Sequence, residues 1–103
     1  MMKTVTWLGS AREELRAMPQ EARFELGYLL WQVQRGEFPQ GTKVMKGLGG
    51  ALELRANHVA GGWFRLIVTV RGETVIVAHG FQKKSNGTPT GAIKTAAQRL
   101  KAC

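Results

Sequence analysis

The sequence predicts one α+β domain in which a helical hairpin packs on a small, mainly antiparallel sheet and a further helix ends the chain. Three observations predict this fold. Apolar residues recur at helical spacing from residue 20 to 35, alternate with polar residues from 52 to 81, and return to helical spacing after 89. Chains divide into domains only well above ~200 residues, so we expect the 103 residues to form a single domain, 1–103.

The first half of the chain predicts a strand and then two helices. Lys3–Trp7 is β-branched and aromatic, which favours a strand. The run Ser10-Ala11-Arg12-Glu13 has the pattern of a capping box, so a helix is expected from Ser10 until shortly before Pro19. A second helix is expected from Pro19 to Gly36. Its apolar stripe should face the sheet and contains Ala22, Leu26, Leu29, Leu30 and Val33.

The second half predicts strands and a last helix. A short strand at Thr42–Met45 precedes a strand that begins at Leu52, and Trp63–Val70 is the strongest strand of the chain. A tight hairpin at Arg71-Gly72-Glu73 then returns the chain along Thr74–Phe81. The remaining segments are the loop Gln82–Gly87 and a helix opened by Thr88-Pro89. Apart from the short strand Thr42–Met45, the predicted order is β-α-α-β-β-β-α.

The charge of the chain is strongly positive and unevenly distributed. Fifteen Lys and Arg against seven Glu give a formal net charge of +8, and there is no Asp. Residues 1–50 hold seven Lys or Arg against five Glu, whereas residues 51–103 hold eight against two, so the second half carries +6. A field of this sign attracts polyanions, of which nucleic acid is the commonest in a cytosol. A solubility surface, or a patch for an acidic protein partner, would have the same composition.

Composition also excludes several classes of protein. Cys103 is the single cysteine, so no internal disulfide or cysteine-based zinc site can form, and a cytoplasmic location is expected. No apolar run approaches the ~18 residues that span a bilayer, and the first ten residues do not resemble a signal peptide. No histidines stand at ligand spacing, and the lack of Asp disfavours paired-carboxylate or two-metal hydrolysis. We expect no metal, no cofactor and no membrane contact.

Two arginines on consecutive strands are the first candidates for a functional site. Arg55 and Arg65 each lie on the face opposite their strand's aliphatic residues, so a hairpin would place both on one exposed face. Neighbouring guanidiniums repel each other but suit a phosphate, which they bind in bidentate geometry. Alternatively, each arginine pairs with a glutamate, for example Arg55 with Glu53 or Glu73.

A lysine pair adds a second candidate. Lys83 and Lys84 follow the last strand and precede the last helix, whose free amides and dipole favour phosphate. By itself such a pair is more often part of a solvated loop. Together with the two arginines it indicates a site for a phosphate group.

Two histidines have side chains suited to proton transfer near neutral pH. Strict alternation places His79 on one strand face with Val75, Val77 and Phe81, which favours a packed core histidine. His58 lies in the predicted turn Ala56–Gly62, and the sequence assigns it no role.

Ordered motifs across the chain resemble a known family. The motifs are Lys46-Gly47-Leu48-Gly49-Gly50-Ala51-Leu52-Glu53-Leu54-Arg55, then Gly62-Trp63-Phe64-Arg65, then Ala78-His79-Gly80-Phe81-Gln82-Lys83-Lys84-Ser85 followed by Thr88-Pro89. In this order they resemble the phage-derived, HigB-like branch of the RelE/ParE toxin superfamily, and the likeness spans almost the whole chain. Each motif is short, but the ordered set is specific. The resemblance implies a RelE-like fold.

The resemblance also implies the toxin of a type II toxin–antitoxin system, encoded beside a helix-turn-helix antitoxin of the HigA-like type. Members with ribonuclease activity cleave mRNA, usually on the ribosome, without a metal. Carried over residue by residue, Arg65 matches the arginine that holds the scissile phosphate, Arg55 matches a second basic position, and Lys83 and Lys84 match the basic end of the last strand. No tyrosine or histidine follows Lys84, in contrast to many relatives, so the proton-transfer residues stay open.

The expected activity is that of a metal-independent endoribonuclease, in which the RNA 2′-OH attacks the adjacent phosphate. Arg55 and Arg65 would hold the phosphorane oxygens, Lys83 or Lys84 would lie near the leaving oxygen, and His79, or else Glu53, would be the base. The residues expected to contact RNA are Phe81, by stacking on a base, and the cations Lys43, Lys46, Lys94, Arg99 and Lys101. The alternative is a non-enzymatic protein, either a ParE-like gyrase inhibitor or a phage-derived binder that modifies the host.

Overall fold

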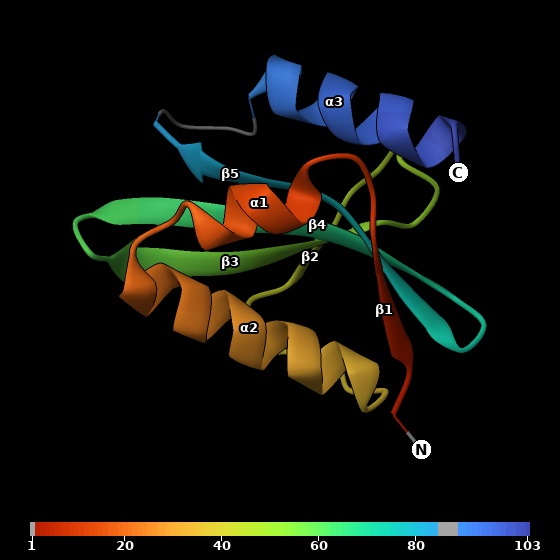
Figure 1. Ribbon diagram of the computed structural model, residues 1–103, viewed down its shortest axis with the longest axis horizontal. Helices are drawn as coiled ribbons and strands as arrows, with labels where there is room; N and C mark the ends of the chain where they lie inside the picture. The colour runs from red at the N-terminus through yellow and green to blue at the C-terminus, as the bar shows by residue number, and fades with distance from the viewer. Residues whose placement is uncertain (1, 85–88) are drawn as a thin grey trace.

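A computed structural model describes residues 2–84 and 89–103 of the chain. Its elements are β1 (Thr4–Trp7), α1 (Ala11–Arg16), α2 (Gln20–Gln34), β2 (Lys43–Val44), β3 (Leu52–Val59), β4 (Gly62–Arg71), β5 (Thr74–Lys83) and α3 (Thr90–Lys101). The strands form one sheet in the order β1-β5-β4-β3-β2, in which β1 pairs with β5 in parallel and the other neighbours are antiparallel (Figure 1). The predicted α+β class is confirmed, and the two-residue β2 lies within the predicted short strand.

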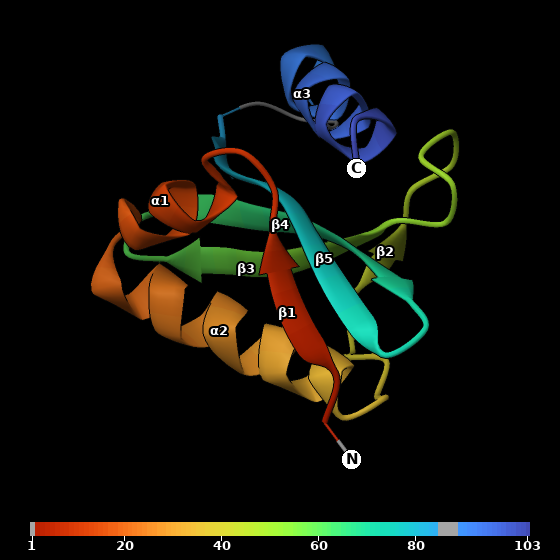
Figure 2. The ribbon, with the colours of Figure 1, turned by 45° about the vertical axis from the view of Figure 1, so that its right-hand side comes forward.

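Helices cover both faces of the sheet. Figures 1 and 2 show α1 and α2 on one side and α3 on the other. The predicted stripe of α2 packs on alternate side chains of β3, β4 and β5, because helix and strand periods both turn apolar positions to one side. Ala96 of α3 packs in a smaller cluster with Ile67 and Ala78 on the opposite face. The helical hairpin expected on the sheet is therefore present.

A β-bulge in β5 corrects the predicted alternation of that strand. The register of β4 against β5 shifts by one residue at Ala78. Val75 and Val77 point into the core under α2, whereas Phe81 joins the cluster beneath α3 and stacks on His79. The prediction that all four share one face is wrong, because a single extra residue moves everything after it to the other face. His79 and Phe81 thus lie on the face that carries the arginine pair.

The start of α1 corrects a second prediction. Ser10 makes no side-chain hydrogen bond to an amide of α1, so no capping box forms. Its hydroxyl donates instead to Oε2 of Glu14 at 3.2 Å, one residue later than the pattern predicts. The end of α2 follows the prediction, since the helix stops at Gln34 and Gly36 takes a φ of +85° that glycine adopts without strain.

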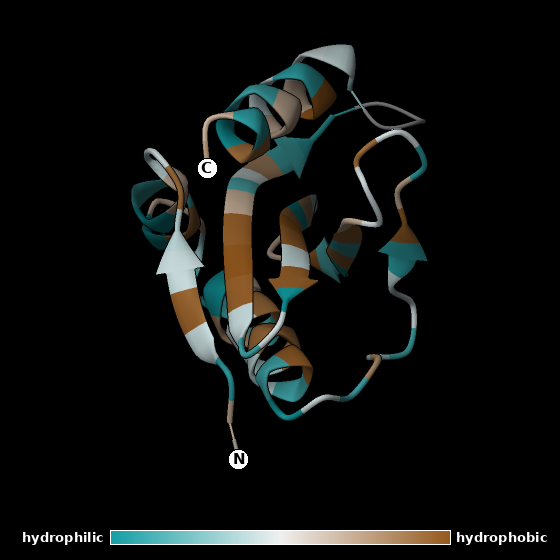
Figure 3. Cartoon of the chain, turned by 90° about the vertical axis from the view of Figure 1, so that its right-hand side faces the viewer, coloured by the Kyte–Doolittle hydropathy of each residue, from teal (hydrophilic) through white to brown (hydrophobic). Residues whose placement is uncertain are grey.

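The carboxyl end of β5 marks the change from core to polar surface. Figure 3 shows the strand hydrophobic through its middle and hydrophilic at its arrowhead, where the sequence has Gln82 and Lys83. Ser85 and Thr88, which belong to the motifs noted above, lie outside the described residues. Within the described ranges, no helix combines the length and the apolar character that crossing a membrane requires.

Candidate phosphate site

Arg55 and Arg65 lie side by side on the sheet face opposite α2. They are direct partners across β3 and β4, and Phe81 is the partner of Arg65 on β5. The neighbouring residues Leu54 and Leu66 point into the core under α2, so alternation turns both guanidiniums to the other face. The hairpin geometry expected from the sequence is therefore present.

One buried carboxylate stands between the two guanidiniums. Oε1 of Glu53 lies 3.9 Å from Nε of Arg55 and 3.8 Å from Nε of Arg65. Arg65 is 2% exposed, whereas 34% of the Arg55 side chain is accessible. Nη1 of Arg65 donates to the carbonyl oxygen of Phe64 at 3.0 Å, and within the described residues neither Nε has a hydrogen-bond partner. The glutamate pairing considered from the sequence is thus real, but one carboxylate serves both arginines.

The electrostatics of this cluster leave an excess of positive charge. Burial lowers the pKa of the Arg65 guanidinium, attraction to Glu53 raises it, and repulsion from Arg55 lowers it again. The guanidinium stays charged nonetheless, because arginine side chains are not deprotonated in proteins. Two guanidiniums and one carboxylate carry a net charge of +1, in surroundings that screen charge less than water does. The cluster therefore favours an anion that approaches from the accessible side of Arg55.

A pocket opens beside the arginine pair at the turn between β3 and β4. It has a volume of about 250 Å³ and is lined by Arg55, Asn57, His58, Trp63, Arg65 and Lys83. A neighbouring hollow of about 510 Å³ shares His58, Trp63 and Lys83 and extends to Lys84. Trp63 and Lys83 are partners across β4 and β5, and the Lys83 Nζ lies 5.8 Å from the centre of the indole ring. Arg55, Arg65 and Lys83 therefore line one pocket, whereas Lys84 lines the neighbouring hollow.

His58 and Trp63 are pocket residues to which the sequence assigned no role. Nε1 of Trp63 donates to Nδ1 of His58 at 3.2 Å, and the rings meet edge to face with centroids 5.7 Å apart. With Nδ1 accepting, the neutral imidazole carries its proton on Nε2. His58 also has a φ of +55°, a conformation that is uncommon outside glycine. Trp63 alternates with Arg65 and could have been found on that basis, whereas no sequence signal marks His58.

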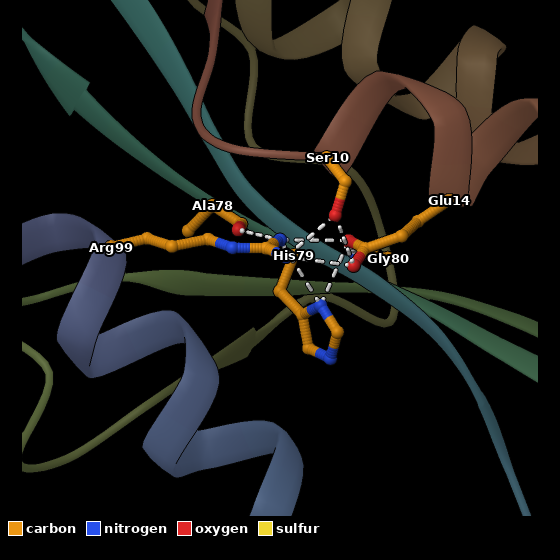
Figure 4. A network of polar contacts seen from close by, with 6 residues as sticks. All are labelled: Ser10, Glu14, Ala78, His79, Gly80 and Arg99. Carbon is orange, nitrogen blue, oxygen red and sulfur yellow. Dashed lines mark hydrogen bonds and ion pairs between the residues drawn. The ribbon is translucent and has the colours of Figure 1, made fainter.

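His79 belongs to a different group of polar contacts, drawn in Figure 4. Its Nδ1 lies 2.9 Å from Oε1 of Glu14, and the amide of Gly80 donates to the same oxygen at 3.1 Å. Arg99 donates to both oxygens of Glu14 at 2.9 Å each, and further to the Ser10 hydroxyl and the Ala78 carbonyl oxygen. These contacts join α1, β5 and α3. The side chains that line the two hollows at the β3–β4 turn do not include His79.

This network keeps Glu14 ionised and occupies Arg99. Burial raises the pKa of the Glu14 carboxyl group, but hydrogen bonds from Arg99, the Gly80 amide and His79 outweigh burial and lower the pKa to about 2. The same hydrogen bonding raises the pKa of Arg99. Because its donors hold α3 against the sheet, we assign Arg99 a structural role in place of the expected RNA contact.

The other residues expected to contact RNA lie at different places. Phe81 stacks on His79 with ring centroids 5.2 Å apart and packs beneath α3, so its ring is already engaged within the protein. Lys43 and Lys46 are exposed beside a separate hollow of about 380 Å³, and Lys94 is exposed on α3. The lysines extend the positive surface over β2 and α3. In the described part of the chain, no three His, Cys, Asp or Glu side chains gather as metal ligands would.

Comparisons with known proteins identify the fold and the family. The chain is similar to a solved structure of a mutant of the E. coli toxin RelE in the free state, with a TM-score of 0.69 and 15% identity over 99% of this chain and 98% of that chain. The molecule is therefore a small basic protein of the RelE fold. Residues 13–101 match the family described as Phage derived protein Gp49-like (DUF891), and the chain belongs to that family. No curated protein matches the chain.

Proposed function

We propose that the protein is the toxin of a type II toxin–antitoxin system and cleaves mRNA as a metal-independent endoribonuclease. The toxin role is supported by the RelE fold, by membership of the Gp49-like family and by the basic surface. Its expected partner is a HigA-like helix-turn-helix antitoxin, and its expected substrate is mRNA on the ribosome in the cytoplasm. The nuclease assignment depends on one observation: two guanidiniums share a single carboxylate at the edge of a pocket that also holds Lys83.

The proposed reaction uses a nucleophile that RNA itself contains. The 2′-OH attacks the adjacent phosphorus, the bond from phosphorus to O5′ breaks, and the products carry a 2′,3′-cyclic phosphate and a 5′-hydroxyl. Negative charge builds up on the phosphorane between these steps, and losing one donor that opposes it raises the barrier by ~3 kcal/mol. Arg55 makes the direct contact because it is accessible. Arg65 is almost fully buried, so it contributes its field and positions Glu53 and Arg55.

Two proton transfers complete the reaction. A base removes the proton of the 2′-OH, and an acid protonates the leaving O5′. His58 is the better placed of the two histidines, because it lines the pocket with Arg55 and Lys83 and carries its proton on Nε2. We assign protonation of the leaving O5′ to the Lys83 ammonium group, with the Nε2–H of His58 donating a hydrogen bond to the same oxygen. His79 is the base expected from the sequence, but its Nδ1 is held by Glu14 and it lines neither hollow at the β3–β4 turn, so we assign no residue to the removal of the 2′-OH proton.

A second candidate function is non-enzymatic binding, such as ParE-like inhibition of DNA gyrase or phage-derived modification of a host protein. The burial of Arg65 favours this candidate. Its side chain is 2% exposed and its guanidinium lies beside Glu53, which is also the environment of an arginine with a purely structural role. In that case the basic face binds an acidic protein surface, and RNA stays intact.

Mapping of mRNA ends separates the two functions. The protein is added to translating ribosomes, and new 5′ ends are located by primer extension. A nuclease gives new ends that fall about a hundredfold in Arg55→Gln and in Lys83→Met, since each change removes a cation near the developing charge. Arg12→Gln removes an exposed cation of α1 and should leave cleavage unchanged. Intact message together with inhibited supercoiling of DNA would support the gyrase function instead.

A further inference from the structure

The outer face of α2 is aromatic although no described element covers it. Phe24, Tyr28 and Trp31 are 66%, 57% and 38% exposed, while the opposite face of the helix supplies the core under the sheet. In Figures 1 and 2 the sheet lies on one side of α2, and its other side is open. Surface helices usually place charged residues on the outer face. A helix that is apolar on both faces indicates a binding surface on the outer one.

The aromatic residues form one stripe along α2, with an acidic residue at one end and a basic residue at the other. Glu21, Tyr28 and Arg35 are spaced by seven residues, which is close to two helical turns, and Phe24 and Trp31 lie between them at the same spacing. The helix therefore presents, from its amino to its carboxyl end, an acid, three aromatic rings and a base. Tyr28 stands at the midpoint of this aromatic stripe. Rotation by half a turn about Tyr28 would place the acid of one helix over the base of another.

Contacts within the aromatic stripe hold its side chains in place. The rings of Tyr28 and Trp31 stack with centroids 5.7 Å apart, and the Arg35 guanidinium lies 4.7 Å from the centre of the Trp31 ring. Nε of Arg35 also lies 3.4 Å from Glu37, but its side chain is 49% exposed and keeps further donors. Side chains that are already ordered lose less entropy when a partner binds.

The distribution of charge favours a second copy of this chain as the partner. The chain as a whole carries +8, yet residues 10–37 hold four Arg and five Glu and carry −1. Two copies that meet through α2 would bring their least positive sides together and turn their basic faces outward. A strongly acidic partner finds no excess of positive charge on this face. The alternation of acid, aromatic and basic residues is instead complementary to itself.

We propose that two copies of the protein associate through an antiparallel, two-fold symmetric contact between their α2 helices. Tyr28 lies next to the symmetry axis, the Phe24 of each copy lies near the Trp31 of the other, and Glu21 pairs with Arg35 twice. Such a contact is isologous, because the same surface serves both copies. The three rings offer about 300 Å² of accessible surface per copy, against about 800 Å² per partner in a standard interface. The association is therefore weak and reversible. The candidate phosphate site of each copy stays accessible, because it lies on the sheet face opposite α2.

Sedimentation velocity over a wide range of protein concentration tests the proposal. The wild type should pass from monomer to dimer as concentration rises. Glu21→Arg and Arg35→Glu should each weaken dimerisation about tenfold, because each change breaks two symmetric ion pairs and places like charges together. The double variant should return to within about threefold of the wild type. Tyr28→Ser should weaken dimerisation about tenfold or more, since it removes the central ring.

Glu73→Arg provides the matched control, because it makes the same charge change at the exposed turn between β4 and β5 and should leave dimerisation unchanged. The altered side chains are exposed, and circular dichroism of each variant confirms that it is folded. A wild type that stays monomeric at every concentration would overturn the proposal. This holds even if a co-expressed antitoxin is found to cover α2. A dimer that tolerates both charge reversals would overturn it as well, by placing the contact on another surface.

Discussion

The stability of the protein should depend on pH through Glu14. Its carboxyl group has a pKa of about 2 in the folded protein, against 4.5 without the fold, because hydrogen bonds from Arg99, the Gly80 amide and His79 outweigh the effect of burial. One pKa unit corresponds to about 1.4 kcal/mol, so the ionised carboxylate stabilises the fold by at most ~3 kcal/mol. A lowered folded pKa means that this stabilisation is complete above the unfolded value and is lost as the pH falls towards 2.

Urea unfolding of Glu14→Gln, followed by tryptophan fluorescence, measures this contribution. Near pH 7 the variant should be less stable than the wild type by about 2–3 kcal/mol, and near pH 3 the difference should shrink by about 2 kcal/mol. Glu13→Gln is the matched control, because Glu13 is the exposed neighbour of Glu14 on α1. A difference between Glu14→Gln and the wild type that stays the same at both pH values would refute this reasoning, as would an equal effect of the control.

Two further predictions concern the backbone near Arg99 and the charge balance of the site. Gly9→Ala should destabilise the fold by about 1–2 kcal/mol, because Gly9 has a φ of +52° and the new Cβ would lie 2.8 Å from Nε of Arg99. Gly27→Ala should stabilise the fold by about 0.5–1 kcal/mol, because a Cβ at this position in α2 meets open space. Urea unfolding measures both variants, and a Gly9→Ala variant more stable than Gly27→Ala would contradict the account. Glu53→Gln should cost about 3 kcal/mol or more by calorimetry, because two guanidiniums lose their shared carboxylate, whereas Arg55→Gln should cost less than about 1 kcal/mol. Equal costs would show that Glu53 does not balance the pair.

Regular periods made much of the fold predictable. The core-facing stripe of α2 repeats with the helical period, and β4 alternates without interruption, so the sequence shows which side of α2 faces the sheet and which side of β4 faces α2. The same alternation brought Arg55 and Arg65 to one face, which is why the arginine pair could be predicted from spacing alone. How far the pair is buried could not be predicted, because that depends on what packs around it.

Features that depend on one extra residue or on distant contacts could not be predicted. The bulge at Ala78 leaves no mark in composition, yet it decides which face His79 occupies. The pairing of Glu14 with Arg99 joins residues 85 positions apart and exists only once α1 and α3 meet at β5. The local sequence pattern predicted a capping box at Ser10, whereas in the structure Ser10 bonds to Glu14. His58 lines the pocket and has a left-handed backbone conformation. This conformation could not be predicted from the sequence, because it is uncommon for residues other than glycine.

Binding of an RNA that cannot be cut tests the central claim most directly. In a short single strand with 2′-O-methyl groups the nucleophile is blocked, so its affinity reports binding without cleavage. The account predicts that Arg55→Gln lowers this affinity about tenfold or more, and lowers the slope of log affinity against log salt by about one. Arg12→Gln, on the exposed surface of α1, should change the affinity by less than about twofold. Equal losses in the two variants would contradict the account, because the overall charge of the protein, and not the arginine pair, would then hold the RNA.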